Sequence, residues 1–330
     1  MAQSSQPSGT QEQRVETFVQ AFRTLRAEMQ KVIVGHDDVV NQVLVGLFAG
    51  GHVLLEGVPG LGKTLLIKTL SECLDLTFSR IQFTPDLMPG DIIGTNIIAE
   101  DAGGRKHFQF QRGPIFGHIL LADEVNRATP KTQSALLEGM QEGNVTVSGT
   151  GHPLPSPFFV LATQNPIEME GTYPLPEAQR DRFTARISMG YPSAESELAM
   201  LDAHGSSSPL EALEPVARAE DMRELIAAVR KVHVADALKQ YVIKLVTATR
   251  STPELRLGAS PRATLHLLRA SRARAALDGR DFVIPDDVQA LALPVLAHRL
   301  LPSAEALVAR QLPEQVLAAI VGQVPLPQFR

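Results

Sequence analysis

A glycine-rich stretch early in the chain has the residue types and spacing of a phosphate-binding loop. It reads Gly57-Val58-Pro59-Gly60-Leu61-Gly62-Lys63-Thr64, which fits the pattern G-x-x-x-x-G-K-[ST] at each specified position. Glycines let the backbone turn tightly enough for successive N–H groups to point at a polyphosphate. A lysine in this place reaches the terminal phosphates, and the threonine hydroxyl coordinates magnesium. The stretch therefore predicts a site for a nucleoside triphosphate and Mg²⁺.

The segments on either side of this loop have the form needed to position it. His52–Glu56 is a short apolar run, typical of a strand buried on both faces of a parallel sheet. Leu65–Leu70 continues as a helix whose positive N-terminal end adds to the field at the phosphates. A flexible glycine turn is the alternative interpretation, and the strand before and helix after the loop argue against it.

Two adjacent acids follow another buried strand. Ile119–Asp123 is apolar up to Asp123, and Glu124 comes next. Parallel strands deliver their last residues to the carboxyl edge of a sheet, where ligands bind. We expect Asp123 to hold hydrated magnesium opposite Thr64, and Glu124 to orient and deprotonate the attacking water. The alternative is a capping pair for the next helix, which the phosphate loop upstream argues against. A kinase or a simple nucleotide switch would not need the second acid.

An uncharged amide ends the next predicted strand. Phe158–Thr163 is followed by Gln164 and Asn165. Asn165 is in position to help Glu124 hold the water. On local sequence alone it is equally well explained as a routine turn residue, so both interpretations stay open.

Bulk properties limit the classes of protein to which the chain can belong. Its 330 residues suffice for two domains with separate cores, and a 44% hydrophobic and 20% charged composition is ordinary for a soluble protein. The net charge of −5 gives no general attraction for nucleic acid or anionic lipid. The single Cys73 excludes an internal disulfide and is predicted to be a buried thiol. With no signal peptide and no apolar run of membrane-spanning length, the expected compartment is the cytoplasm, without membrane contact.

The order of predicted elements divides the chain into an α/β part and a helical part. Residues 1–13, rich in Ser and Gln, are predicted to be a disordered tail, residues 14–191 an α/β nucleotide-binding core and residues 192–330 a helical domain. Alternating strands and helices in the core predict a parallel sheet covered on both faces. Two hairpins, Asn96–Gln111 and Asn144–Pro157, interrupt it. The helices expected after Pro192 are Ser193–Leu201, Asp221–Val229, Asp236–Arg250, Pro261–Leu277 and Pro285–Leu296.

Together these motifs make the chain resemble a known family over nearly its whole length. The motifs are GVPGLGKT, LLADEVNRA, LATQNP and GTYPLPEAQRDRF, followed by GASPRA in the helical part. Their order and spacing resemble AAA+ ATPases, and the phrases QFTPDLMPGDIIG and GTYPLPEAQ resemble the MoxR family in particular. The resemblance implies an AAA+ core with a helical lid, and a ring, usually a hexamer, that holds nucleotide between neighbouring subunits. It also implies a chaperone-like motor that acts on a protein client, often with a von Willebrand A-domain partner.

The resemblance assigns further residues to the site. Val34-Gly35 matches the segment that packs on the adenine, Asn165 the first sensor, Arg182 the arginine finger and Arg262 the second sensor. One position departs from the family pattern, because Arg180 stands where an aliphatic residue is usual. Arg180 or Arg182 is therefore the finger, or the two share the task. The predicted catalytic residues are Glu124, Asn165 and Arg182, and the predicted ATP-binding residues are Val34, Gly35, Gly57, Pro59, Gly60, Leu61, Gly62, Lys63, Thr64, Leu65 and Arg262, with Thr64 and Asp123 as magnesium ligands.

Two other classes of function stay open. The same motor can remodel nucleic acid, which needs basic contacts in the hairpins. The first hairpin offers Arg105, Lys106 and His107, with Arg112 just beyond it, whereas the second has only His152. The chain can also be a nucleotide switch that does not hydrolyse ATP. In this family the hairpins match insertions that face the central pore, and the alternative is two surface hairpins without a motor role.

Overall fold

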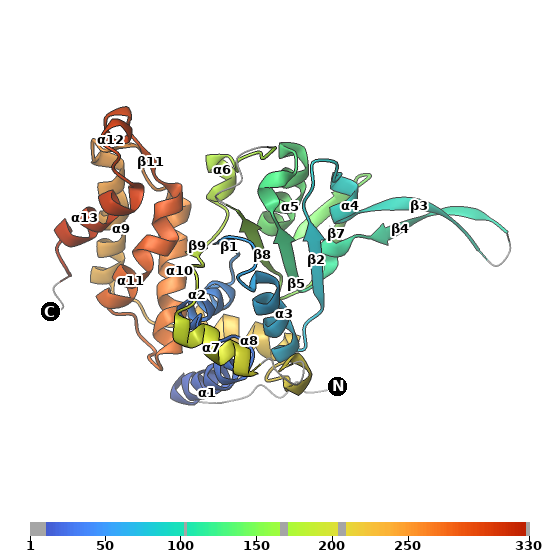
Figure 1. Ribbon diagram of the computed structural model, residues 1–330, viewed down its shortest axis with the longest axis horizontal. Coiled ribbons are helices and arrows are strands. Elements are labelled where there is room, and N and C mark those ends of the chain that lie inside the picture. Colours follow the sequence, from blue (N-terminus) through green and yellow to red (C-terminus); the bar gives the residue numbers. More distant parts are fainter. Residues whose placement is uncertain (1–10, 102–103, 166–170, 204–208, 328–330) are drawn as a thin grey trace, which may run out of the picture.

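A five-stranded sheet forms the centre of the protein, with helices on both faces and a further group of helices beside it (Figure 1). The computed structural model describes residues 11–101, 104–165, 171–203 and 209–327. Residues 1–10 of the predicted tail lie outside the described residues, and residues 11–13 already belong to the first helix.

The core contains nine strands and six α-helices within the described residues. The strands are β1 Val53–Glu56, β2 Phe78–Gln82, β3 Gly94–Glu100, β4 Lys106–Arg112, β5 Ile119–Asp123, β6 Asn144–Val147, β7 Thr150–Pro153, β8 Phe159–Gln164 and β9 Ala185–Ser188. The helices are α1 Gln11–Gln30, α2 Asp37–Phe48, α3 Lys63–Cys73, α4 Pro89–Ile93, α5 Pro130–Glu142 and α6 Glu177–Arg180, with 3₁₀ turns η1 Pro114–Phe116 and η2 Val125–Arg127.

The lid is helical, as predicted, with one short ribbon that the sequence pattern did not indicate. Its helices are α7 Ala194–Ala203, α8 Ala219–Val229, α9 Asp236–Ser251, α10 Pro261–Leu277, α11 Pro285–Leu296, α12 Ala304–Val308 and α13 Pro313–Gln323, with η3 Pro209–Ala212 and η4 Ala297–Arg299. The ribbon pairs β10 Leu255–Leu257 with β11 Leu301–Pro302. The predicted bounds of α10 and α11 are confirmed, whereas α12 and α13 were not predicted.

The sheet has the order β2-β5-β8-β1-β9, and all of its strand pairs are parallel. The parallel sheet predicted from the alternation of strands and helices is therefore confirmed. Strands β1, β5 and β8 match the strands predicted above, and β9 was not predicted. Because the strands are parallel, Gln82, Asp123, Gln164, Glu56 and Ser188 all lie at the carboxyl edge.

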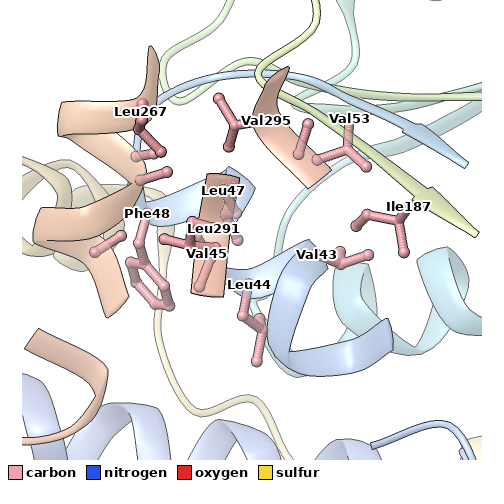
Figure 2. Packing of buried hydrophobic residues seen from close by; sticks show 14 of the residues in the cluster. Val43, Leu44, Val45, Leu47, Phe48, Val53, Ile187, Leu267, Leu291 and Val295 are labelled. Atoms are coloured by element: carbon pink, nitrogen blue, oxygen red, sulfur yellow. The ribbon is translucent and has the colours of Figure 1, made fainter. Parts of the chain in front are cut away.

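Two apolar clusters hold the sheet, one on each face. Consecutive side chains of a strand point to opposite faces, so Leu54 packs in one cluster with α5 residues while Val53 and Leu55 pack in the other. The larger cluster continues from the sheet through α2 into lid helices α10 and α11. Figure 2 shows this junction, where the labelled side chains are Val43, Leu44, Val45, Leu47 and Phe48 of α2, Val53 and Ile187 of the sheet, and Leu267, Leu291 and Val295 of the lid. Core and lid are thus packed as one apolar body.

Cys73 closes α3 inside this larger cluster. It is a buried free thiol, as predicted, and burial raises its pKa to about 12. A thiol with so high a pKa is a poor nucleophile near neutral pH.

The two predicted hairpins are present and lie side by side. β3 pairs with β4 and β6 with β7, both antiparallel; residues 102 and 103, in the turn of the first hairpin, lie outside the described residues. The Asn96 amide donates to Ser148 Oγ at 3.1 Å, and the rings of Phe110 and His152 stack with centroids 4.1 Å apart. Beyond these contacts the β3–β4 hairpin projects away from the body of the protein (Figure 1).

None of the helices formed by the described residues is long and apolar enough to cross a membrane.

A buried histidine links the sheet to α5. His52 precedes β1; its Nε2 lies 3.0 Å from the carbonyl oxygen of Met140, and its Nδ1 accepts the Val160 N–H at 3.1 Å. This arrangement requires a neutral ring with the proton on Nε2, since a protonated Nδ1 would face the Val160 N–H. Burial accordingly lowers the pKa of His52 to about 4.

We expect His52 to make folding sensitive to acid. Between pH 6.5 and 4 the unfolded chain binds a proton that the folded chain does not, so stability is present above pH 6.5 and is lost as the pH falls. Over this window the free energy of unfolding should fall by about 3 kcal/mol more in the parent chain than in His52→Gln. Urea unfolding at a series of pH values measures this, with His107→Gln, on the exposed hairpin, as the control. Parallel curves for the parent and His52→Gln would contradict the assignment.

Candidate active site

The phosphate loop leaves the carboxyl end of β1 and forms an open cradle. Gly60 and Gly62 have left-handed φ angles of +87° and +83°, which favour glycine. A Cβ added at either position would meet no heavy atom within 4 Å, so the space beside the loop is free. The loop therefore has both the backbone conformation and the room to receive a phosphate group.

Helix α3 begins at Lys63, directly after the loop. Gly62 occupies the N-cap position without a side-chain hydrogen bond, so no cap side chain satisfies the first N–H groups of the helix. The Lys63 ammonium donates to the carbonyl oxygen of Gly57 at 2.6 Å and so lies across the loop. Burial lowers the pKa of Lys63, while the charges of Asp123 and Glu124 oppose that shift. Loop amides, ammonium and helix end together present the donors that an anion-binding site requires.

Thr163 ties Asp123, the last residue of β5, and Glu124, which follows it, to the neighbouring strand β8. Its hydroxyl donates to Asp123 Oδ1 at 2.6 Å and accepts the backbone N–H of Glu124 at 2.9 Å. Glu124 has a left-handed φ of +56°, an unusual conformation for a residue with a side chain and one that occurs often at functional sites. The turn at Glu124 accompanies a different set of partners for the two carboxylates, because Asp123 contacts Thr163 and Arg80 whereas Glu124 contacts Gln82.

Strand β2 contributes two further side chains to the acids. Arg80 donates to Asp123 Oδ2 at 2.8 Å, and Gln82 donates to Glu124 Oε2 at 2.7 Å. Arg127 adds an ion pair to the same Glu124 oxygen at 3.1 Å. Sequence reasoning missed these three residues and Thr163. The available signal was the spacing of Arg80 and Gln82, because residues two apart on a strand share a face.

Asn165 lies at the same edge of the sheet as the loop. The Gly57 N–H donates to the carbonyl oxygen of Gln164 at 3.4 Å, and the Gln164 amide donates to the Glu56 carboxylate. Asn165 follows directly and is buried. The structure thus brings Asn165 together with the loop and the two acids, while its role as a sensor stays a prediction.

A cavity of about 210 Å³ opens beside the loop. Its lining residues are Glu56, Gly57, Val58, Leu61, Ser188, Met189, Gly190 and Tyr191. Gly35 lies next to the chain that leaves this cavity, since a Cβ at Gly35 would come within 2.5 Å of Ser196 Cβ on α7. Val34-Gly35 is therefore close to the cavity. If the phosphates of a nucleotide lay in the loop, its base would need a surface to pack against at this place.

Arg182 and Arg262 do not join this group. Arg182 precedes the amino end of β9, and the Thr184 N–H donates to the carbonyl oxygen of His52, the residue before β1. Arg262, the second residue of α10, pairs with Asp181 at 3.9 Å. Both arginines thus lie at the amino edge, opposite the loop, separated from it by the length of β9, about 13 Å. Arg180 ends α6 close to Arg182, and burial lowers its pKa.

The residues at the carboxyl edge fit a magnesium ion bound with phosphate. In the part of the chain that the structure describes, no three His, Cys, Asp or Glu side chains form a complete metal site. Magnesium usually takes only one or two ligands from the protein and the rest from phosphate and water. Asp123 and the Thr64 hydroxyl, beside an open phosphate cradle, match that donor set.

Comparison with known proteins agrees with this site. The sequence model described as "ATPase family associated with various cellular activities (AAA)" matches residues 52–185, and the one described as "AAA lid domain" matches residues 247–319. The chain is 48% identical over 311 residues to "Chaperone MoxR1" of Mycobacterium tuberculosis, covering 91% of this chain and 81% of that protein. It is 31% identical over 348 residues to "Protein MoxR" of Paracoccus denitrificans, covering 93% and 96%.

A solved structure shows the same fold. It is described as a "putative ATPase" from Cytophaga hutchinsonii, is 40% identical in sequence and superposes with a TM-score of 0.89 over 96% of this chain and 98% of that one. The phosphate loop, the acidic pair at the end of β5 and the helical lid define the class as an AAA+ ATPase. Within that class, the chain belongs to the MoxR family.

We expect the Thr163 hydroxyl to be needed for the arrangement of the acids. Thr163→Val keeps the shape but leaves a buried Asp123 oxygen without its charge-assisted hydrogen bond, so the free energy of unfolding should fall by about 2 kcal/mol. Mg²⁺-dependent ATP binding should weaken as well. Thr163→Ser, which keeps the hydroxyl, is the control. Denaturant unfolding and nucleotide titration measure the two effects, and equal losses in both variants would contradict the role of the hydroxyl.

Proposed function

We propose that this chain hydrolyses Mg-ATP by in-line attack of water and uses the energy to remodel or mature protein complexes. The Asp123–Glu124 pair, held by Thr163 at the same edge as the phosphate loop, carries this proposal. A protein that only binds nucleotide needs a magnesium ligand such as Asp123. It has no use for a second acid turned toward the same edge.

Each residue of the loop edge has a separate task in this mechanism. The loop amides and Lys63 hold the terminal phosphates, while Thr64 and Asp123 hold the metal. When bound, Mg²⁺ supplies neutralisation of the phosphate charge. Arg80 and Thr163, which hydrogen-bond the two Asp123 oxygens, fix the direction of that carboxylate.

Glu124 is the proposed general base. Gln82 and Arg127 contact its carboxylate and hold it in place at the carboxyl edge of the sheet. Its carboxylate holds a water molecule in line with the terminal phosphate and removes a proton as the water attacks. Asn165, at the end of the adjacent strand, helps to orient the same water through its side-chain amide.

The proposed arginine finger acts on a neighbouring copy of the chain. Arg182 lies at the edge of the sheet opposite its own loop, so a second protomer must present its amino edge to complete the site. Such a head-to-tail contact between unlike surfaces closes into a ring when the rotation allows it. We therefore propose a homo-oligomeric ring, with the hexamer usual for the family. Arg262, paired with Asp181 beside Arg182, faces the same neighbour.

A protein is the proposed client, and the hairpins the proposed contact. Ile98 and Phe108 face each other across β3 and β4 and are 66% and 77% exposed. They give the projecting hairpin an apolar surface that suits unfolded or extended polypeptide. We propose that the hairpins line the central pore and that a von Willebrand A-domain protein is a partner; the relative named "Chaperone MoxR1" supports this class of function. The net charge of −5 argues against nucleic acid as the client.

Glu124→Gln should trap ATP. Loss of the base is expected to lower turnover by about 10²- to 10⁴-fold while the loop still binds nucleotide. Phosphate release and the nucleotide retained after gel filtration measure both effects, and client capture by this trap identifies the partner. Rapid hydrolysis by Glu124→Gln would exclude Glu124 as the base. Absence of turnover in the parent chain would instead favour a non-hydrolysing switch.

Arg182→Ala should lose turnover by about 10³- to 10⁵-fold and still bind ATP and assemble, because an arginine finger acts only in the transition state. Arg180→Ala is the matched variant, two residues away. Steady-state ATPase assays at saturating ATP compare the two. If Arg182→Ala kept the parental rate and Arg180→Ala did not, the finger would be Arg180; comparable losses in both would mean that the two arginines share the task.

A further inference from the structure

A buried lid arginine binds the segment that carries the proposed finger. Arg299, on η4, is 5% exposed. Its Nε donates to Asp181 Oδ1 at 2.8 Å, and its Nη2 donates to the backbone carbonyl oxygens of Asp181, at 3.2 Å, and of Phe183. One guanidinium thus binds the chain immediately before and immediately after Arg182.

Helix α10 of the lid holds the same segment from a second direction. The Ser260 hydroxyl, at the N-cap of α10, lies 2.9 Å from both carboxylate oxygens of Asp181. His266 Nδ1 lies 2.8 Å from the Thr184 hydroxyl. The residues on both sides of Arg182 are therefore fixed to the lid by side chains that come from two separate lid elements.

Arg182 itself takes no part in this anchoring through its Nε, which is buried and has no hydrogen-bond partner among the described residues. Asp181, the acid next to it, is already paired with Arg299 and Arg262. The ion pairs of Asp181 are thus with Arg299 and Arg262 and not with Arg182. Arg299, Ser260 and His266 hold the segment, whereas Arg182 is left for its proposed role as the finger.

We infer that Arg299 is a positioning residue for the arginine finger, through which the lid of one protomer sets the reactivity of the ATP site in the next. The inference rests on the proposed function, in which Arg182 completes a neighbour's site. The chain's own phosphate loop follows the carboxyl end of β1 and so lies at the opposite edge of the sheet from the contacts of Arg299 with Asp181 and Phe183.

Arg299→Lys tests this role because it keeps the positive charge and loses the planar fork that reaches three acceptors. We expect kcat for ATP to fall by about 100-fold, the loss that a misplacement of about 1 Å can cause, with little change in KM. Arg280→Lys is the control: Arg280 makes a similar two-point contact with buried Asp287 in the lid, away from the finger, and its loss should leave kcat unchanged. A rise in KM without a fall in kcat for Arg299→Lys would overturn the inference.

Rings of mixed subunits separate an effect on the neighbour from an effect on the same chain. Lys63→Ala lacks a working pocket but supplies a finger, and Arg182→Ala has the opposite defect, so rings containing both should regain activity. Arg299→Lys should regain activity with Lys63→Ala and not with Arg182→Ala. The reverse pattern, or recovery with neither, would overturn the inference. If Arg299→Lys does not assemble, Asp181→Asn, at the other end of the contact, is read in the same way.

The reference mixture distinguishes failure of this inference from failure of the proposed function. If Lys63→Ala and Arg182→Ala do not restore each other, the shared site itself is wrong, and the inference is overturned with it. If they do restore each other but Arg299→Lys regains activity with neither of them, as expected for a general folding defect, only the positioning role is overturned.

Discussion

The parallel direction of five strands separates two sets of charges that the proposed chemistry requires together. Every strand delivers its last residue to the edge that holds the phosphate loop, Asp123 and Glu124. The arginines that resemble the finger and second sensor lie before the amino end of β9 or beside it. No side chain spans a sheet of this depth, so an anion at one edge and the cations at the other meet only between copies of the chain. On this account, the sheet makes hydrolysis depend on assembly.

The lid is packed closely on its own core, and this packing strengthens the dependence of hydrolysis on assembly. The apolar cluster that runs from the sheet through α2 to α10 and α11 is continuous (Figure 2). Ion pairs also join the sheet to the lid, because Arg186 of β9 pairs with Glu56 of β1 and with Glu314 of α13. A lid held by packing of this kind moves with its core rather than away from it. Changes at one nucleotide site are therefore expected to reach the next subunit as displacements of a whole core–lid unit.

The parts of the site that depend on local spacing could be predicted from the sequence. The loop from Gly57 to Thr64 and the acids at the end of β5 are contiguous runs, and their local patterns predict strand, turn and helix without knowledge of the neighbours. Asn165 was predicted for the same reason, as the residue that follows a buried strand. Strand β9 was missed because it is four residues long and carries Arg186, and an edge strand of this length has little apolar signal.

Other parts of the site depend on register and on contacts between distant segments. Arg80, Gln82 and Thr163 reach the acids because β2, β5 and β8 are aligned as they are, and the local sequence does not show which strands become neighbours. Arg299 is 118 residues from Asp181 in the chain and looks like any other arginine after a helix. Its importance follows from burial, which the sequence does not reveal for a charged residue.

The dependence of ATPase turnover on assembly tests the central claim most directly. Specific activity per chain should be measured over a dilution series, with the oligomeric state determined at each concentration by light scattering or mass photometry. The shared-site account predicts that activity falls to background as the assemblies dissociate into monomers. Monomers that hydrolyse ATP as fast per chain as the assembled protein would contradict it.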